Sequence, residues 1–239
     1  EEEMILGPGD DCRDILIPYI YMSSNILLNK YIEHTILRPD TTILEVEQIC
    51  HEALKYQFAG VCVPSYFLES AVELLTDTGI DIVTVIGFPY GYNSLMSKFE
   101  EAEDAINRGA DHLDMVINIA AVKNNDWETV ENEIDTINRL VKRENKIFKL
   151  IAETGLMSEI ELELICKIAN DLKIDYLKTS TGVNGAGANM EVVTAMREML
   201  DKSIKIKASG GIRTRTAALE LIEAGADRIG ASKSVEMMG

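Results

Sequence analysis

The chain has 239 residues, and its 46% hydrophobic and 26% charged content is typical of a globular protein that buries a full core. The formal net charge of -17 disfavours nucleic acid or an anionic membrane as a partner. In a protein of this charge, any site for an anionic ligand must be locally positive. No apolar run approaches the roughly 20 residues that cross a bilayer, and we expect a cytoplasmic protein.

The N-terminal segment lacks the basic start and long apolar core of a secretory signal. Residues 1–21 also fit no pattern that recurs later, and Met22 is a candidate start. We therefore assign residues 1–21 to an extension of uncertain origin and residues 22–239 to one domain.

From Tyr31 onward, short apolar strand-like runs alternate with amphipathic helix-like segments. The strand-like runs lie at 34–37, 60–63, 82–87, 112–118, 148–153, 175–182, 205–214 and 228–232. The helix-like segments lie at 43–54, 65–75, 96–108, 126–143, 159–171, 190–200 and 214–224.

This alternation predicts an α/β fold, a single (β/α)8 TIM barrel. An open doubly wound sheet is the main alternative, but such a sheet usually has fewer strands and does not close. Only residues 233–239 follow the last strand, so we expect the closing C-terminal helix to be short or truncated.

Cysteine and histidine spacing indicates no metal site and no disulfide framework. The cysteines form no CxxC pair, and the histidines show no ligand spacing. These residues are Cys12, Cys50, Cys62, Cys166, His34, His51 and His112. We expect reduced thiols and a surface position for His51.

Four successive predicted strands, the fourth to the seventh, each have one apolar face and one face with ionisable side chains. Residues two apart in a strand share a face, and the outward face of a barrel packs under helices. The polar face is therefore predicted to line the barrel interior, and in the seventh strand it holds Lys205, Lys207 and Ser209. The ionisable residues predicted to define this interior set are Asp114, Lys149, Glu153, Lys178 and Lys207.

Lysines inside a barrel indicate chemistry, because burying an unpaired ammonium lowers its pKa. A neutral lysine amine is the nucleophile of a Schiff-base enzyme. We expect the charge of Lys207 to lower the pKa of Lys178, while Asp114 keeps Lys207 charged or relays protons. The alternatives are lysines that face solvent and a buried salt-bridge network that only fills the barrel.

Glycine-rich turns follow the seventh and eighth strands, where barrel enzymes often bind phosphate. The first turn runs Ser209–Gly210–Gly211–Ile212–Arg213, the second runs Gly230–Ala231–Ser232–Lys233, and Gly182 is a candidate third wall. Adjacent glycines let backbone N–H groups approach an anion. Arg213 and Lys233 add positive charge, so we predict a phosphate site, although plain turns would explain single glycines.

At these residues the chain resembles the deoxyribose-phosphate aldolases, a family of class I aldolases. The motifs run in family order from Tyr31 to Ser232 and are IEHTILRPDTT, VCVPSYF, TVIGFPYG, HLDMVIN, LIAETG, YLKTSTG, KIKASGGIRT and RIGAS. The resemblance implies that Lys178 forms the Schiff base, Lys207 lowers its pKa and Asp114 relays protons. It also implies phosphate or substrate contacts by Gly182, Gly210, Gly211, Ile212, Gly230, Ser232 and Glu33, which stands where many members have Asp.

The implied reaction is reversible cleavage of 2-deoxy-D-ribose 5-phosphate to acetaldehyde and D-glyceraldehyde 3-phosphate. No metal or cofactor is expected, because the protonated imine is the electron sink. The resemblance also implies a homodimer or homotetramer. The alternatives are another phosphate-binding barrel enzyme, transaldolase-like or an isomerase, and a catalytically weak barrel that binds sugar phosphate as a scaffold.

Overall fold

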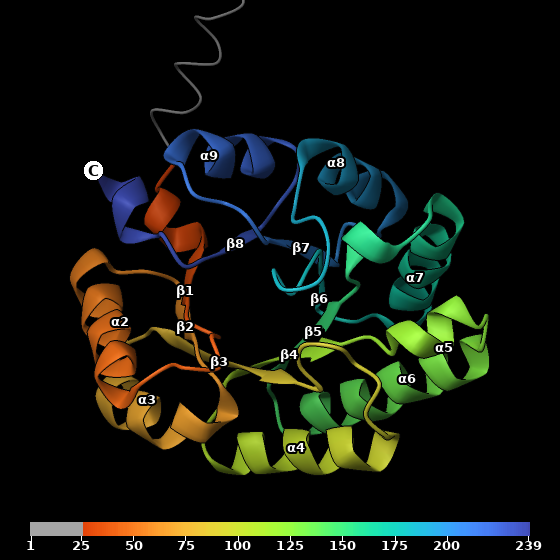
Figure 1. The fold of residues 1–239 in the computed structure, drawn as a ribbon, viewed down its shortest axis with the longest axis horizontal. Helices are drawn as coiled ribbons and strands as arrows, with labels where there is room; N and C mark the ends of the chain where they lie inside the picture. Colours follow the sequence, from red (N-terminus) through yellow and green to blue (C-terminus); the bar gives the residue numbers. More distant parts are fainter. Residues whose placement is uncertain (1–25) are drawn as a thin grey trace, which may run out of the picture.

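The computed structural model describes residues 26–239 (Figure 1), so the assignments for residues 1–21 and for Met22 lie outside the described residues. Eight parallel strands close into a barrel in sequence order, with β1 (Ile32–Thr35) paired to β8 (Arg228–Ala231). Helices surround this ring (Figure 1). The predicted TIM barrel is confirmed, and the open-sheet alternative is wrong.

The order of strands and helices follows the predicted alternation. The other strands are β2 (Gly60–Cys62), β3 (Asp81–Ile86), β4 (His112–Val116), β5 (Ile147–Ile151), β6 (Tyr176–Lys178) and β7 (Lys205–Ser209). The α-helices are α2 (Ile43–Tyr56), α3 (Leu68–Leu75), α4 (Leu95–Asn107), α5 (Ile119–Lys123), α6 (Trp127–Arg143), α7 (Glu159–Leu172), α8 (Met190–Met199) and α9 (Arg215–Glu223). The 3-10 helices are η1 (Leu28–Tyr31), η2 (Ser65–Phe67), η3 (Thr154–Leu156) and η4 (Val235–Met238).

The core has an outer apolar layer between strands and helices and a small apolar cluster inside the barrel. Leu113, Met115 and Ile117 belong to the outer layer, as the alternation along the fourth strand predicts. Cys62, Val83 and Val85 form the inner cluster. The remaining interior is charged, and it positions the site described below.

Most strand ends differ from the prediction. The largest differences are at the sixth and seventh strands, which end at Lys178 and Ser209 rather than at residues 182 and 214, because the glycine turns that follow them leave the strand conformation. The first strand begins at Ile32 rather than at residue 34. The fourth strand stops before Asn118, whose side chain instead accepts a hydrogen bond from the amide of Ala121 and caps the unpredicted helix α5. The fifth strand ends before Glu153, which takes a left-handed backbone conformation with φ of 54° that a strand cannot contain.

The last strand is followed by the four-residue helix η4, which contacts both α2 and α9. In Figure 1 this segment, marked by the C-terminus, lies between those two helices. The expectation of a short closing helix is confirmed. Within residues 26–239, no helix combines the length and the apolar character that a membrane crossing requires.

Candidate active site

Five buried charged side chains meet inside the barrel. Lys178 Nζ lies 2.8 Å from Asp114 Oδ2, and Lys207 Nζ lies 2.6 Å from the same oxygen. Lys149 Nζ lies 2.9 Å from Asp114 Oδ1 and 3.2 Å from Glu33 Oε1, while Lys207 also donates to Glu33 Oε2. Each of the five side chains is at most 3% exposed.

The parallel register places four of these residues in two cross-strand pairs. Asp114 is paired with Lys149 across β4 and β5, and Lys178 with Lys207 across β6 and β7. Glycine makes room beside them: a Cβ atom at Gly230 would lie 3.1 Å from Cε of Lys207. The predicted interior positions of Asp114, Lys149, Lys178 and Lys207 therefore agree with the geometry.

Two predicted interior residues are placed differently. Lys205, at the start of β7, is exposed, because the strand begins at the rim of the barrel. Its ammonium lies 5.4 Å from the ring centre of Tyr176. Glu153 is fully buried, but it lies beyond the end of β5 and away from the charged cluster.

Charge balance identifies the lysine that is best suited to be neutral. Two carboxylates, those of Asp114 and Glu33, face three ammonium groups. Lys149 and Lys207 each contact both carboxylates, whereas Lys178 contacts only Asp114. Deprotonation of Lys178 therefore removes one ion pair, whereas deprotonation of Lys149 or Lys207 would remove two.

The pKa directions agree with this balance. Burial, the largest cause, lowers the pKa of Lys178 below its ordinary value; Lys207 lowers it further, and Asp114 opposes the change. Burial acts in the same direction on Lys207, but Asp114 and Glu33 outweigh it and raise the pKa of Lys207. Lys207 is thus held as a cation beside an amine that gives up its proton readily.

Both carboxylates remain ionised. Burial alone would raise the pKa of Asp114, but Lys149, Lys178 and Lys207 together hold that pKa far below the ordinary range. The pKa of Glu33 is lowered in the same way, with Lys149 and Lys207 outweighing burial. The two acids therefore supply the fixed negative charge that keeps Lys207 protonated.

A second set of polar residues, missed in the sequence analysis, lies next to Glu33. Nδ1 of His112 is 3.9 Å and Nε of Arg228 is 3.7 Å from Glu33 Oε1. These three buried atoms have no hydrogen-bond partner among the described residues. The sequence did indicate that both residues face the barrel interior, because residues two apart in a strand share a face. His112 precedes Asp114 by two residues, and Arg228 precedes Gly230 by two.

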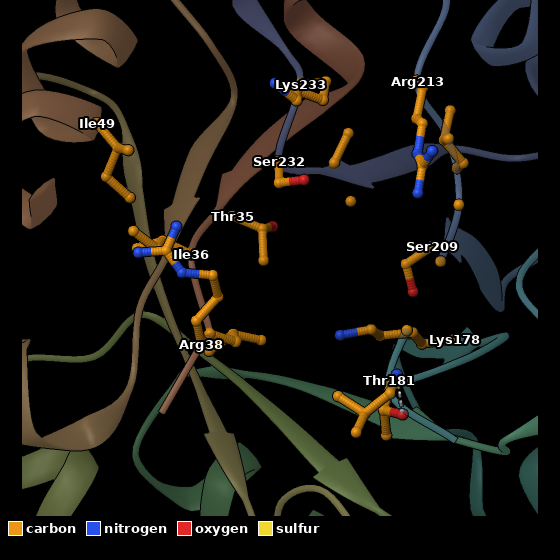
Figure 2. A pocket seen from close by; sticks show the side chains of 18 of the residues that line it. Thr35, Ile36, Arg38, Ile49, Lys178, Thr181, Ser209, Arg213, Ser232 and Lys233 are labelled. Atoms are coloured by element: carbon orange, nitrogen blue, oxygen red, sulfur yellow. Dashed lines mark hydrogen bonds between the residues drawn. The ribbon is translucent and has the colours of Figure 1, made fainter. Parts of the chain in front are cut away.

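A cavity of about 640 Å³ opens above the charged cluster, and Lys178 is the cluster member that lines it. Figure 2 shows the Lys178 side chain pointing into this cavity, with Ser209 nearby. The predicted phosphate and substrate residues that line the cavity are Gly182, Ser209, Gly210, Gly211, Ile212, Gly230 and Ser232. One cavity thus joins the Lys178 amine to all three predicted glycine-containing turns.

The turns at one side of the cavity depend on glycine. Gly182, Gly210 and Gly211 have φ of 81°, 93° and 76°, which residues with a Cβ atom rarely adopt. Gly182 and Gly210 also touch: a Cβ atom on Gly182 would lie 3.5 Å from the Cα atom of Gly210. The backbones after β6 and β7 therefore form adjacent walls of the cavity.

The cavity is locally positive in an acidic protein. Arg38, Arg213 and Lys233 line it, and Figure 2 shows Arg213 and Lys233 near Ser232. Arg38 is paired with Asp40 and Glu45, and Lys233 with Glu236. Within residues 26–239, no ion pair involves Arg213, so Arg213 is the cation best placed to meet an anionic ligand.

The sequence analysis missed Thr35, Arg38 and Thr181, which also line the cavity. Thr35 and Thr181 lie at or just beyond the carboxyl ends of strands, where the functional residues of barrel enzymes are commonly found. This position in the sequence could have predicted them as site residues. The structure does not bring Glu33, predicted as a substrate contact, to the cavity. Glu33 lies beneath the lysines, because Lys149 and Lys207 hold it there.

Comparisons with known proteins agree with this site. A family model described as DeoC/LacD family aldolase matches residues 28–239. A deoxyribose-phosphate aldolase of Caldicellulosiruptor saccharolyticus is 44% identical over 210 residues, which cover 87% of this chain and 96% of that protein.

Two solved structures share the fold and much of the sequence. The deoxyribose phosphate aldolase of Aeropyrum pernix superposes with a TM-score of 0.86 at 30% identity and covers 96% of this chain and 97% of its own. A putative deoxyribose-phosphate aldolase of Coccidioides immitis superposes with a TM-score of 0.84 at 36% identity, over 88% of this chain and 84% of its own. This chain therefore belongs to the DeoC/LacD family of aldolases.

Proposed function

We propose that this protein is a class I aldolase that cleaves 2-deoxy-D-ribose 5-phosphate reversibly to acetaldehyde and D-glyceraldehyde 3-phosphate. The observation that carries the proposal is the position of Lys178, whose buried amine has a lowered pKa and lines a cavity walled by glycine turns. The names of the similar proteins support the same substrate.

The phosphate end of the substrate binds at the turns after β7 and β8. Backbone N–H groups of Gly210 and Gly211 and the guanidinium of Arg213 are suited to a phosphate dianion. The hydroxyl-bearing residues Ser209 and Ser232 of these turns line the same cavity as Lys178, and Ser209 lies near Lys178 (Figure 2). This arrangement directs the aldehyde end of the sugar toward the amine.

In the cleavage direction, the neutral amine of Lys178 adds to the C1 aldehyde, and loss of water gives a protonated imine. The C3 hydroxyl then loses its proton as the C2–C3 bond breaks, and the bonding electrons move into the imine to form an enamine. Glyceraldehyde 3-phosphate leaves, a proton returns to the enamine carbon, and hydrolysis of the imine releases acetaldehyde and restores Lys178.

Asp114 and Lys207 serve the proton steps. Oδ2 of Asp114 lies within hydrogen-bond distance of the amines of both Lys178 and Lys207, so it connects the two. Protons removed from or returned to carbon pass through water to this pair. Glu33 supports the pair by holding Lys207 protonated, a role that differs from the predicted substrate contact.

Borohydride reduction tests the proposal directly. With acetaldehyde and borohydride, mass spectrometry should find an ethyl group on the peptide that contains Lys178, and Lys178→Ala should abolish the label. Lys205→Ala removes an exposed lysine on β7 and should leave the label in place.

The same assay separates the alternatives. An isomerase forms no reducible adduct, and a scaffold binds sugar phosphate without releasing acetaldehyde. Labelling that persists in Lys178→Ala would move the nucleophile to another lysine and overturn the assignment.

The proposal also covers the domain organisation, the cellular location and the oligomeric state. We propose one domain over residues 22–239, a cytoplasmic location, and a homodimer or homotetramer. The tetrameric structure of the Aeropyrum pernix enzyme supports an oligomer. Light scattering on the purified chain measures the oligomeric state, and a mass of one chain would contradict this part.

A further inference from the structure

The loop after β6 carries Gly182, one wall of the cavity, and it packs against a buried carboxylate that the mechanism does not use. Glu153 is fully buried and lies beyond β5 in a left-handed backbone conformation with φ of 54°. Glutamate rarely adopts this conformation, which costs on the order of 1 kcal/mol or more. Its surroundings must therefore hold it in place.

Those surroundings are hydrogen bonds from the β6 loop. Glu153 Oε1 accepts from the amide of Thr181 at 3.2 Å, and Oε2 accepts from the Thr181 hydroxyl at 2.5 Å and from Asn184 Nδ2 at 3.3 Å. The Thr181 hydroxyl in turn accepts from the amides of Val183 and Asn184 at 3.1 and 3.3 Å. One carboxylate thus organises the backbone on both sides of Gly182.

The opposite side of the loop rests on the turn after β7. The amide of Ala188 donates to the carbonyl oxygens of Ser209 and Gly210 at 3.1 and 3.2 Å. Gly187 is so close that a Cβ atom there would lie 2.1 Å from the Gly210 oxygen. The loop is therefore held between Glu153 and the turn that forms the predicted phosphate site.

We propose that Glu153 is a positioning residue that sets the affinity for the phosphate end of the substrate by holding the β6 loop against the β7 turn. This inference rests on the proposed function. Glu153 does not line the cavity, and no ion pair or hydrogen bond joins it to the lysine cluster within residues 26–239. Its effect therefore reaches the substrate through Thr181 and Gly182.

The contacts require a carboxylate. Both oxygens of Glu153 accept hydrogen bonds, from an amide and a hydroxyl of Thr181. A glutamine has one acceptor and one donor end, so its NH2 group would face a donor from the loop. Glu153→Gln changes little in size yet breaks one side of this arrangement.

The test compares substrates with and without phosphate. In Glu153→Gln, KM for 2-deoxyribose 5-phosphate should rise about tenfold, as expected for loss of a hydrogen bond to a charged group. Values of kcat/KM for unphosphorylated 2-deoxyribose, and borohydride labelling of Lys178 by acetaldehyde, should stay within about twofold of wild type, because the amine site is untouched.

A matched control is Glu133→Gln, which alters another buried carboxylate, on α6, that pairs with Lys98 outside the barrel. It should leave KM for the phosphorylated substrate unchanged. Thr181→Val removes the hydroxyl partner of Glu153 with little change in volume. The double variant Glu153→Gln/Thr181→Val should be no worse than the more affected single variant, because both break the same link.

The outcomes are distinct. Equal losses on both sugars, additive effects in the double variant, or an unchanged KM would each overturn the positioning role. If Glu153→Gln does not fold, Asn184→Ala tests the same link, because Asn184 Nδ2 donates to Glu153 and Asn184 does not line the cavity. A wild-type protein without aldolase activity would contradict the proposed function. In that case, titration of wild type and Glu153→Gln with inorganic phosphate would still test Glu153, since equal affinities would contradict its role.

Discussion

Lys178, the proposed nucleophile, differs from the other two buried lysines of the cluster in the carboxylates that it contacts. Lys149 and Lys207 each reach both carboxylates, while Lys178 reaches only Asp114. Burial without full pairing favours the neutral form of an amine. The pKa of Lys178 is lowered accordingly, and burial contributes more to that fall than Lys207 does.

Lys207→Leu tests the electrostatic part of this account. It removes the cation that lowers the pKa of Lys178 and leaves Asp114, which raises it, so the pKa of Lys178 should rise. The neutral amine exists above that pKa, so the acid limb of the profile of kcat/KM against pH should move to higher pH. The rate should also fall by about a hundredfold or more, because the variant lacks the proposed proton relay.

Lys205→Leu is the matched control, because it removes an exposed lysine two residues earlier on the same strand. Its pH profile should match that of the wild type. An unmoved acid limb in Lys207→Leu would show that Lys207 does not lower the pKa of Lys178.

At the scale of elements, the site depends on how closely the ends of neighbouring strands approach. The loops after β6 and β7 meet at Gly187 and Gly210, where a side chain on Gly187 would collide with the backbone. Backbone cannot yield as a flexible side chain can. The glycine therefore sets the distance between the two walls of the cavity.

Gly187→Ala should push these loops apart, lower stability by about 2 kcal/mol, and raise KM for the phosphorylated substrate. Urea unfolding and steady-state kinetics measure the two effects. Gly79→Ala is the control, because Gly79 has φ of 77° but a Cβ atom there would meet nothing within 4 Å. That variant should lose about 1 kcal/mol from backbone strain with KM unchanged; a normal KM in Gly187→Ala would contradict the close packing.

At the scale of the whole molecule, two carboxylates in the barrel interior make stability depend on pH. The pKa values of Asp114 and Glu33 are lowered by folding, since the lysines favour their ionised forms. A carboxyl with a lowered folded-state pKa contributes stability that is present above its unfolded value of about 4 and is lost as pH falls toward the folded value.

The melting temperature should therefore fall steeply as the pH drops below about 4. Asp114→Asn removes one of these groups, so its melting curve should depend less on pH in that range. The variant is less stable at neutral pH because Lys178 loses its carboxylate partner, while Lys149 and Lys207 keep only Glu33. Differential scanning calorimetry from pH 7 down to pH 3 measures both. A wild-type melting temperature independent of pH there would contradict the lowered pKa values.

Local sequence patterns were sufficient for the order of elements and for the interior face of most strands. Alternation placed Asp114, Lys149, Lys178 and Lys207 inside, because an outward charge would lie under an apolar helix. It failed at Glu153 and Lys205, since periodicity does not mark where a strand ends. Short helices such as α5 also lack enough residues to show a helical period.

Residue types and spacing by themselves determined the barrel, the candidate lysines and the glycine turns, because these depend on short-range periodicity and on motifs contiguous in the chain. Only the tertiary structure decided which carboxylate each lysine meets, that Glu33 lies below the cavity, and that Glu153 holds the β6 loop. The reason is physical: those contacts join different strands and loops, and their distances follow from the register and closure of the whole barrel.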